Sequence, residues 1–579
     1  MNRSSTPRAM RHRPQRLTAA LIATFGALAA VPSRAIPIDT GNPDLTLRFD
    51  NEVRYNAGWR VQGIDDRMKY SNPGVPVFSA VGDNQFDKGD MILNRFDLLS
   101  ELDLVYKERS GLRVSAAAWA DPTYGRHIKA PDSLEPVVVA FYQNGDYSNY
   151  TRRYVHGPSG EFLDAFVFTS FDAGGTTTSL KFGRHNVYWG NSLFPQSAHS
   201  SIAFSQGALD NQKSAVSPGV ETKELFLPQN QLTGTLTLNP EWTVYGQYSF
   251  EWRPTRFPEG ATYYEYFLGA FFGPNGPAVA PTIHQPKKSG GDFGIMVKYN
   301  PASWGGANVG LAYREFYEKV AGTFYSPDFG QTLGQSYNDQ KTKLLGLSAE
   351  RNFGNVNIGA ELTYRTNTTL NTAAGVQALL DSDRPARGDA VGFLVNAITL
   401  LPRTALWDGG ELAAELAYNK IQRVTFDPGL NAIGAGVTGN PVGTPAGYKV
   451  VGSPFCTDAA GAFGKGDAGN GCITKAGGWV ISANFQPRWP QAFAGVDLSA
   501  PTFVSYGLSG NGNSASISAG QVLYQFGLQA DVYQKYVVKL AYTGGHSRSQ
   551  TTPSGGLTGS GTWWQNDRGW LNLSLRTSF

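Results

Sequence analysis

Apolar and polar residues alternate in the segment that begins at Leu45 and ends at Val61. Its odd positions read Leu, Leu, Phe, Asn, Val, Tyr, Ala, Trp and Val, whereas its even positions read Thr, Arg, Asp, Glu, Arg, Asn, Gly and Arg, and Gln62 follows. Neighbouring residues of a β-strand point to opposite faces, so the segment predicts a strand with one apolar and one charged face. A strand of a soluble sandwich has a similar pattern, and only repetition along the chain separates the two interpretations.

Segments of this kind recur as hairpins and predict about 18 strands, with 16 to 20 as the range. An even number is typical of single-chain bacterial barrels. The predicted strands are 45–61, 96–106, 112–121, 162–171, 179–188, 232–238, 242–252, 293–299, 307–316, 344–351, 356–365, 390–400, 412–421, 479–485, 493–508, 522–532, 537–544 and 570–579.

Short and long connections alternate between these strands. If both ends of the chain lie in the periplasm, the short connections are periplasmic turns and the long ones are extracellular loops. The long connections are roughly 62–92, 122–161, 189–229, 253–290, 317–340, 366–387, 422–476, 509–519 and 546–567. The pattern therefore predicts an all-β fold, a transmembrane antiparallel β-barrel with short periplasmic turns and long extracellular loops.

Composition favours a barrel over a helical membrane protein. The 579 residues include 68 glycines, 12% aromatic residues and only 16% charged residues. Beyond the N-terminus, no apolar run reaches the ~18 residues that a membrane helix needs. In lipid every backbone polar group must be paired, so a membrane protein without such helices has to close its sheet. The composition is uniform along the chain, without an obvious linker, which predicts one barrel domain over residues 36–579.

Residues 1–35 have the features of a secretory signal peptide. The apolar stretch Leu17–Val31 follows a basic region, and small-residue cleavage signals end at Ala29 and Ala35. The alternative is a soluble protein with a basic, disordered start. The segment has six arginines and no acid, so its removal changes the formal charge from +3 to −3, with 43 basic against 46 acidic side chains. The mature chain then has no basic field for nucleic acid. The basic region contains Arg3, Arg8, Arg11, Arg13 and Arg16.

The charged faces of the first three predicted strands carry both signs. Because these faces would point into the barrel, their side chains are candidate lumen-lining residues, held in cross-strand pairs. A mutually neutralised, solvated lumen is one interpretation, and a conducting path that sorts solutes by charge is the other. The candidates are Arg54, Arg60, Arg95, Glu101 and Arg113.

The chain ends in an alternating strand closed by an aromatic residue. Leu571, Leu573 and Leu575 face one side, and Phe579 continues that face. A C-terminal aromatic on such a strand resembles the signal read by the barrel-assembly machinery, which predicts that machinery as a partner. Outer-membrane lipid is the other expected partner, since the apolar faces have to be covered.

The only two cysteines, Cys456 and Cys472, lie close together in a Gly-rich segment. An exported protein reaches an oxidising compartment, where this pair would form a disulfide that closes one loop. A free thiol or a metal site would be the alternative, but no histidine is nearby.

Three stretches carry a family resemblance. Leu180–Phe194 reads LKFGRHNVYWGNSLF, residues 217–228 read SPGVETKELFLP, and NPEWTVYGQYSFEW begins at Asn239. These stretches resemble the proteobacterial family known as domain of unknown function 1302 (DUF1302), over essentially the whole mature chain. Family members carry a G-R-Q-x-x-x-W-G-E-S-like segment followed by P-G-x-x-x-K-E-x-x-x-P. This chain departs from the pattern at His185, where Gln is expected, and at Asn191, where Glu is expected.

The resemblance implies an outer-membrane barrel whose biochemical activity is not established. It also implies an association with export pumps of the resistance-nodulation-division type and a periplasmic partner family. We therefore add periplasmic or inner-membrane export components to the expected partners, and the bacterial outer membrane as the location.

The long connection 189–229 is the candidate constriction of the barrel. The first strand begins about ten residues after the cleavage site, which leaves no room for an N-terminal plug or hatch. A loop must then provide any narrowing, and this one mixes aromatic with charged and amide side chains. The candidate constriction residues are Arg184, Asn191 and Lys223. The alternative is a surface loop that packs or covers the barrel.

An enzyme is the rival class, and we expect no catalytic, cofactor or metal site. The mature chain has six histidines, at 127, 156, 185, 199, 284 and 546, and none lies in a recognisable nucleophile or zinc motif. An adhesive or purely structural barrel is the third class, because long polar loops suit contact with other surfaces. The sequence favours a channel that passes small molecules, hydrophobic or aromatic ones included, without an energy source.

Overall fold

The computed structural model of the chain describes residues 36–68, 70–72, 75–76, 79–130, 135–141, 145–205, 207–220, 222–265, 282–321, 323–325, 334–370, 384–385, 387–426, 477–510, 517–551, 557–559 and 562–579. The predicted signal peptide and the predicted disulfide of Cys456 and Cys472 lie outside these residues. Among the described residues, no helix has the length and apolar character needed to cross a membrane.

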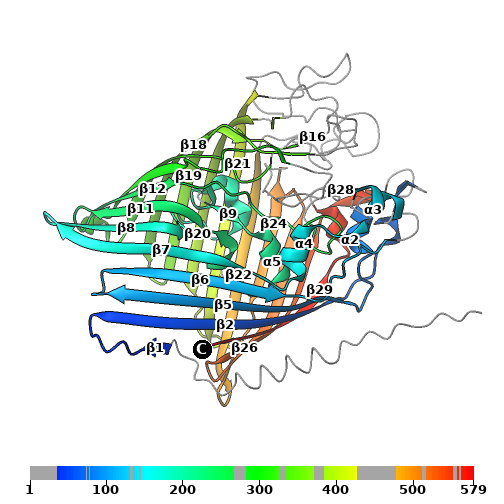
Figure 1. The fold of residues 1–579 in the computed structure, drawn as a ribbon, viewed down its shortest axis with the longest axis horizontal. Coiled ribbons are helices and arrows are strands. Elements are labelled where there is room, and N and C mark those ends of the chain that lie inside the picture. The colour runs from blue at the N-terminus through cyan, green and yellow to red at the C-terminus, as the bar shows by residue number, and fades with distance from the viewer. Residues whose placement is uncertain are drawn as a thin grey trace, which may run out of the picture.

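Eighteen antiparallel strands of the described residues close into one barrel, as the alternation of the sequence predicts (Figure 1). Each strand pairs with its neighbours in the chain, and the last strand pairs with the first. The strands are β2 (Leu45–Arg60), β5 (Met91–Tyr106), β6 (Ser110–Ala120), β7 (Ser159–Ala173), β8 (Thr176–His185), β11 (Gln229–Thr237), β12 (Trp242–Ser249), β14 (Phe293–Tyr299), β15 (Asn308–Phe316), β18 (Thr342–Phe353), β19 (Val356–Thr369), β20 (Arg387–Leu400), β21 (Gly409–Phe426), β22 (Gly477–Phe493), β23 with β24 (Val496–Ser499 and Thr502–Ser509), β25 (Val522–Val532), β26 (Tyr536–His546) and β29 (Trp570–Ser578).

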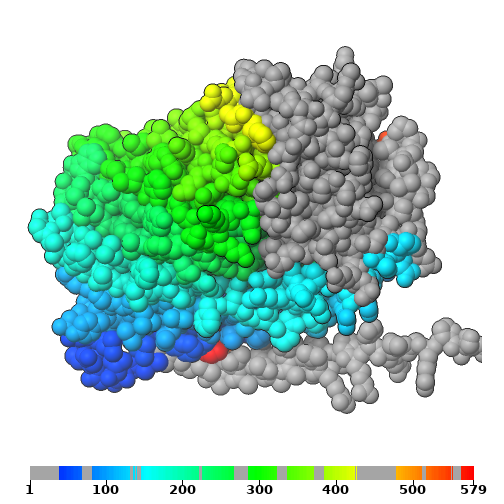
Figure 2. All heavy atoms as spheres, turned by 45° about the horizontal axis from the view of Figure 1, so that its top comes forward, coloured from blue at the N-terminus to red at the C-terminus, as the bar shows by residue number. Residues whose placement is uncertain are grey.

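Short and long connections lie at opposite ends of the barrel. The end with the short connections, on the left in Figure 1, is called the turn end, and the end with the long ones is called the loop end. Tight turns such as Gly174–Gly175 join β7 to β8 at the turn end, where both glycines adopt positive φ, of 60° and 82°. Figure 2 shows the wall from outside, with colours in chain order from blue to yellow, because neighbouring strands are consecutive in sequence.

The seam that closes the barrel lies between β2 and β29. Its register runs from Glu52 opposite Ser578 to Arg60 opposite Trp570. Phe579 then exchanges two backbone hydrogen bonds with Asn51, of 2.8 and 2.9 Å. The short strand β1 (Ile36–Ile38) pairs with Leu47–Phe49 of β2, which β29 does not reach. The N-terminal strand therefore continues the seam toward the turn end.

One predicted turn is wrong. The sequence predicts a turn at 486–492, but β22 continues to Phe493 and the chain turns at Ala494–Gly495, where Gly495 adopts a φ of 73°. Pro487 stays in register opposite Gly410, and the pairing of β22 with β23 shifts register between Trp489 and Phe493. Pro490 lies within this stretch of shifted register, where sheets tolerate proline, so it does not end the strand.

The outer surface of the barrel is aliphatic in the middle and aromatic toward both ends. This arrangement is typical of barrels that span membranes, because aromatic rings favour the headgroup level. Exposed aliphatic side chains of the middle include Leu180, Ile295, Leu311, Leu347, Leu362 and Leu540. Exposed rings near the turn end include Tyr106, Phe171, Trp242, Trp304, Phe353 and Phe493, and those near the loop end include Phe162, Phe182, Tyr188, Tyr248, Phe250 and Tyr364.

The long connections contain short helices and small sheets. Several of those at the loop end pack around one apolar core, in which Phe86 meets the ring of Tyr124 at 5.3 Å and Tyr264 meets Trp570 at 5.7 Å. The elements of the long connections are η1 (Asp66–Met68), β3 (Tyr70–Asn72), β4 (Val75–Pro76), α2 (Ser79–Asp83), α3 (Glu135–Phe141), α4 (Asn149–Thr151), η3 (Arg152–His156), η4 (Pro195–Ser200), η5 (Ala203–Ser205), β9 (Ala208–Leu209), α5 (Asn211–Val216), α6 (Thr222–Leu225), β10 (Phe226–Leu227), β13 (Thr282–His284), β16 (Thr323–Tyr325), β17 (Gly334–Ser336), β27 (Ser549–Thr551), β28 (Leu557–Gly559) and η8 (Trp563–Gln565). A further short helix, η6 (Ala302–Trp304), lies in the short connection between β14 and β15.

Candidate functional site

The inner wall of β5, β6 and β7 carries a cluster of paired charges. Arg113 lies 3.5 Å from a carboxylate oxygen of Asp103 and 3.7 Å from one of Asp164, and it donates a short hydrogen bond to Glu101. The Arg113 side chain is 28% exposed. Two of the predicted lumen residues, Glu101 and Arg113, therefore lie together on the inner face, where solvent reaches them.

The other three predicted lumen residues also lie on the inner face, but the long connections bury them. Arg54 pairs with Glu224 of α6 at 2.8 Å, and Arg95 pairs with Asp97 at 2.9 Å. Arg60 lies 3.4 Å from Asp83 and donates to four backbone carbonyls, those of Asp83 and Phe86 among them. These arginines are at most 2% exposed, so they join the wall to the connections and do not face an open lumen.

The connection between β8 and β11 enters the barrel and crosses it. We call residues 186–228 the crossing segment. On one side, Ser217 donates to Asp97 of β5 at 2.9 Å, and Asp210 pairs at 2.7 Å with Arg256, which also binds Glu161 of β7 at 2.8 Å. Figure 1 shows β9 and α5 within the outline of the barrel, among the labels of β20, β22 and β24.

The other side of the crossing segment lies against the opposite wall, on two buried glutamates. Glu361 of β19 accepts hydrogen bonds from the backbone N–H groups of Asn191, Ser192 and Ile202, the last at 2.6 Å. Glu415 of β21 accepts from the N–H of Leu193 at 2.8 Å and from that of Phe194 at 3.3 Å. Ionised carboxylates form strong hydrogen bonds with backbone N–H groups, so these two side chains fix the segment to the wall.

Glycines on the inward face leave room for the segment. A Cβ atom on Gly346 would lie 2.6 Å from the Ile202 side chain. One on Gly392 would lie 2.5 Å from the Cα of Ser200, and one on Gly294 would lie 2.9 Å from the Trp189 ring. Real Cβ contacts are essentially never this short. The wall of β14, β18 and β20 therefore admits the crossing segment only because these positions lack side chains.

The three predicted constriction residues occupy different places. Arg184 lies on β8, before the crossing segment, and its guanidinium is 3.5 Å from the carbonyl of Phe162. Asn191 lies at the far wall, where its amide donates to the carbonyl of Ala349 at 2.9 Å. Lys223 lies in α6, on the side of β2. Of these three, Asn191 makes the direct contact between the crossing segment and the opposite wall.

His185, the other departure from the family pattern, is a buried wall residue. Its Nδ1 donates to the carbonyl of Gly183 at 3.0 Å, and its Nε2 lies 2.9 Å from the hydroxyl of Thr233. In the part of the chain that the structure describes, no group of three or more His, Cys, Asp or Glu residues could hold a metal ion.

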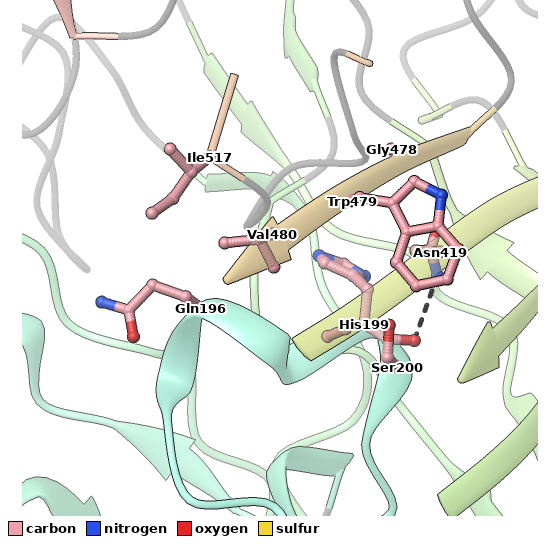
Figure 3. A pocket seen from close by; sticks show the side chains of 9 residues that line it. Gln196, His199, Ser200, Asn419, Gly478, Trp479, Val480 and Ile517 are labelled. Carbon is pink, nitrogen blue, oxygen red and sulfur yellow. Dashed lines mark hydrogen bonds between the residues drawn. The ribbon is translucent and has the colours of Figure 1, made fainter. Parts of the chain in front are cut away.

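A small hollow remains where the crossing segment meets β21 and β22. Figure 3 shows Gln196 and His199 of η4 on one side, with Val480 and Ile517 facing them. The amide of Asn419 donates to the carbonyl of His199 at 3.2 Å, which closes one edge of the hollow. The space is narrow, so side chains of the segment and the wall fill most of this part of the lumen.

At the loop end, buried carboxyl groups hold connections to one another. Glu259 accepts hydrogen bonds from Ser148 at 2.7 Å and from Thr151. Burial raises the pKa of Glu259 to about 7, and these hydroxyl donors lower it only in part. Arg568 binds Asp83 and Glu265, each at 2.7 Å, and burial likewise raises the pKa of Glu265 to about 7.

The sequence could not indicate several of these residues. Glu361 and Glu415 look like any inward acid of an alternating strand, and the residues of the crossing segment that they bind are 159 or more positions away. Their only sequence signal is indirect, since glycines recur at inward positions of the neighbouring strands. Arg54, by contrast, is placed on the inner wall by alternation alone.

The model of a protein family described as "protein of unknown function (DUF1302)" matches residues 16–579. No curated protein matches the chain. Among solved structures, similar chains include the outer membrane channel DcaP of Acinetobacter baumannii, with 10% identity, 94% of this chain and 99% of that chain covered, and a TM-score of 0.34. Acinetobacter baumannii OccAB4 has 8% identity, coverage of 93% and 100%, and a TM-score of 0.40. Pseudomonas putida OprB has 10% identity, coverage of 95% and 100%, and a TM-score of 0.37.

Proposed function

Because the chain belongs to the DUF1302 family, whose description assigns no activity, we propose from the barrel itself that it is an outer-membrane channel for small molecules, narrowed by the crossing segment. The turn end faces the periplasm and the loop end faces the outside, as in other barrels with this asymmetry. Passage follows the solute gradient, and no catalytic step is part of the proposal.

One observation carries the proposal. The crossing segment spans the barrel between Asp97 of β5 and the pair Glu361 and Glu415 of β19 and β21. A barrel that served only as a membrane anchor or a loop display would not need a folded segment across its interior. A channel does need one, because a barrel of this strand number is otherwise wide enough for an aqueous pore.

The solutes that suit this lumen are small, and hydrophobic or aromatic ones are included. Aromatic rings pack along the segment: Phe194 lies 5.8 Å from Phe503 of β24, and Phe204 stacks on Phe226, also of the segment, at 5.7 Å. Apolar pockets with a few polar groups are the usual sites for such molecules.

Conductance in planar bilayers tests the proposal. We expect discrete channels from the purified wild-type barrel, and a larger conductance from the double variant Glu361→Ala and Glu415→Ala, because the segment then loses its attachment to the far wall. Glu350→Ala is the matched control, since Glu350 lies on the same inner wall of β18 and binds Asn357 instead of the segment.

Two results would contradict it. An absence of channels from correctly folded wild type, with no swelling of liposomes in small sugars or aromatic solutes, would favour an adhesive or structural barrel. A double variant that conducts like the wild type would show that the segment does not set the width of the pore.

A further inference from the structure

Arg314 differs from the other buried arginines of the inner wall. It lies on β15 and is 0% exposed. Within the described residues, none of its three guanidinium nitrogens has a hydrogen-bond partner. Arg54 and Arg95, which are equally buried, each bind a carboxylate within 3 Å. A buried charge without a partner is costly, so such a group in a folded protein calls for an explanation.

Trp189 of the crossing segment covers Arg314. The guanidinium carbon lies 5.4 Å from the centre of the Trp189 ring and 5.8 Å from that of Phe316. An aromatic face attracts a cation, but more weakly than a carboxylate does. Around them, Met296, Ala312 and Leu344 form a buried apolar cluster with Trp189 and Phe316. The charge therefore lies at the bottom of an apolar enclosure with an aromatic cover.

A second arginine lies on the same row of the sheet. Arg314 is opposite Leu344, and Leu344 is opposite Arg365. Two strand spacings separate the arginines, which is about 10 Å. Arg365 donates to the carbonyls of Ala198 and Ser201, at 2.9 and 2.6 Å. Within the described residues, neither arginine forms a salt bridge, although Asp292 lies within electrostatic range of Arg314, and Glu318 and Glu361 lie within that of Arg365.

The bonds from the segment to Glu361 and Glu415 do not involve Trp189. Trp189 precedes Gly190, which adopts a φ of 92° and lies against Glu361. The attachment of the segment begins at Asn191, after this glycine. A rotation of the Trp189 side chain would uncover Arg314 and leave the bonds to Glu361 and Glu415 in place.

We propose that Arg314 binds the carboxylate of a small organic monoacid with an apolar body, and that Trp189 covers this site until the acid enters. A carboxylate supplies the two parallel acceptors that a guanidinium fork matches. The apolar enclosure takes the body of the acid, and it disfavours ions with several charges, which would lose more hydration. The inference rests on the proposed channel function, since it names the solute class of the same lumen.

Binding of benzoate and of the neutral analogue benzamide to the purified full-length barrel tests the site. We expect wild type to bind benzoate more tightly than benzamide by about tenfold or more, with a change in tryptophan fluorescence as Trp189 moves. Arg314→Met should remove the preference. Arg576→Met is the matched control and should keep it, because Arg576 lies on the inner wall of β29, 3.8 Å from Glu52.

Arg314→Met keeps an unbranched side chain, although a shorter one, and removes an unpaired charge, so it should fold at least as well as wild type. If it does not fold, Arg314→Lys should still weaken benzoate binding, because an ammonium cannot bind the carboxylate with two parallel bonds. Equal preference for benzoate in wild type and in the folded Arg314 variant would overturn the site.

The binding experiment does not depend on conduction. A preference for benzoate that needs Arg314, in a barrel without channels, would retain the site and reject the channel. Channels in bilayers without any preference for benzoate would retain the channel and reject the site.

Discussion

Individual glycines decide whether the crossing segment can lie inside the barrel. Gly346 and Gly392 are inward positions of β18 and β20, and any side chain there would occupy the place of Ile202 or Ser200. Glycine weakens a strand interior, so its presence at these positions indicates a close approach of another backbone. The segment and the wall are thus fitted to one another residue by residue.

Gly392→Val should therefore displace the segment and raise the conductance. A valine would collide with the backbone at Ser200, yet valine suits a strand, so the barrel itself should assemble. Gly246→Ala on β12 is the control, since a Cβ atom there has no neighbour within 4 Å. Single-channel recordings of the two variants measure the difference, and an unchanged conductance of Gly392→Val would contradict the fitted arrangement.

Alternation places single residues on the correct face, but it cannot supply their partners. It puts Arg54, Arg60 and Arg95 on the inner wall. That Arg54 binds Glu224 is a contact between residues 170 positions apart, which depends on where a long connection folds. For the same reason the sequence could not tell whether these arginines face solvent or a buried segment.

At the scale of elements, strands and connections differ in how far sequence reasoning reaches. Strands are predicted closely, because a period of two repeated over many segments is a strong signal. β22 is the exception. Its predicted end is Phe485, but the strand continues for eight more residues through prolines and a register shift. The short helices of the connections have no such period, and tertiary contacts decide them.

The loop-end connection around Glu259 should depend on pH. Burial raises the pKa of this carboxyl to about 7 in the folded chain, whereas an exposed glutamate has a pKa of about 4.3. Because the pKa is higher in the folded chain, the contribution of this carboxyl to folding stability is fully present when the pH is below the pKa of the unfolded chain. It is lost as the pH rises through about 7. Amide exchange in α4 and η3, corrected for its intrinsic pH dependence, should therefore be faster at pH 8.5 than at pH 5. Glu259→Gln should remove that difference, and a difference that persists in the variant would assign the effect to another group.

The C-terminal residue of β29 should affect assembly. Deletion of Phe579 removes both backbone bonds to Asn51 together with the proposed signal for the barrel-assembly machinery. We expect a clear fall in the folded, heat-modifiable fraction in cell membranes, whereas Phe579→Tyr, which keeps an aromatic ring, should assemble like the wild type. If the deletion variant assembles as efficiently as the wild type, Phe579 is not an assembly signal, although the assignment of β29 as a strand is unaffected.

At the scale of the whole molecule, the sequence predicts the closed barrel of about eighteen strands with short turns at one end and long loops at the other. These properties depend on patterns that are local and repeated, so many weak signals add. The course of the crossing segment depends on long-range contacts that occur once in the molecule. No repeated pattern in the sequence therefore supports a prediction of it.

The crossing segment also has a mechanical consequence. It joins β2 and β5 to β19 and β21, which lie on opposite sides of the ring of strands. A thin-walled cylinder flattens easily under uneven lateral pressure, and a strut across its diameter resists that ovalisation. Without the strut, the cross-section would fluctuate with the tension of the surrounding bilayer, so the current through a strutless barrel should be noisy as well as large.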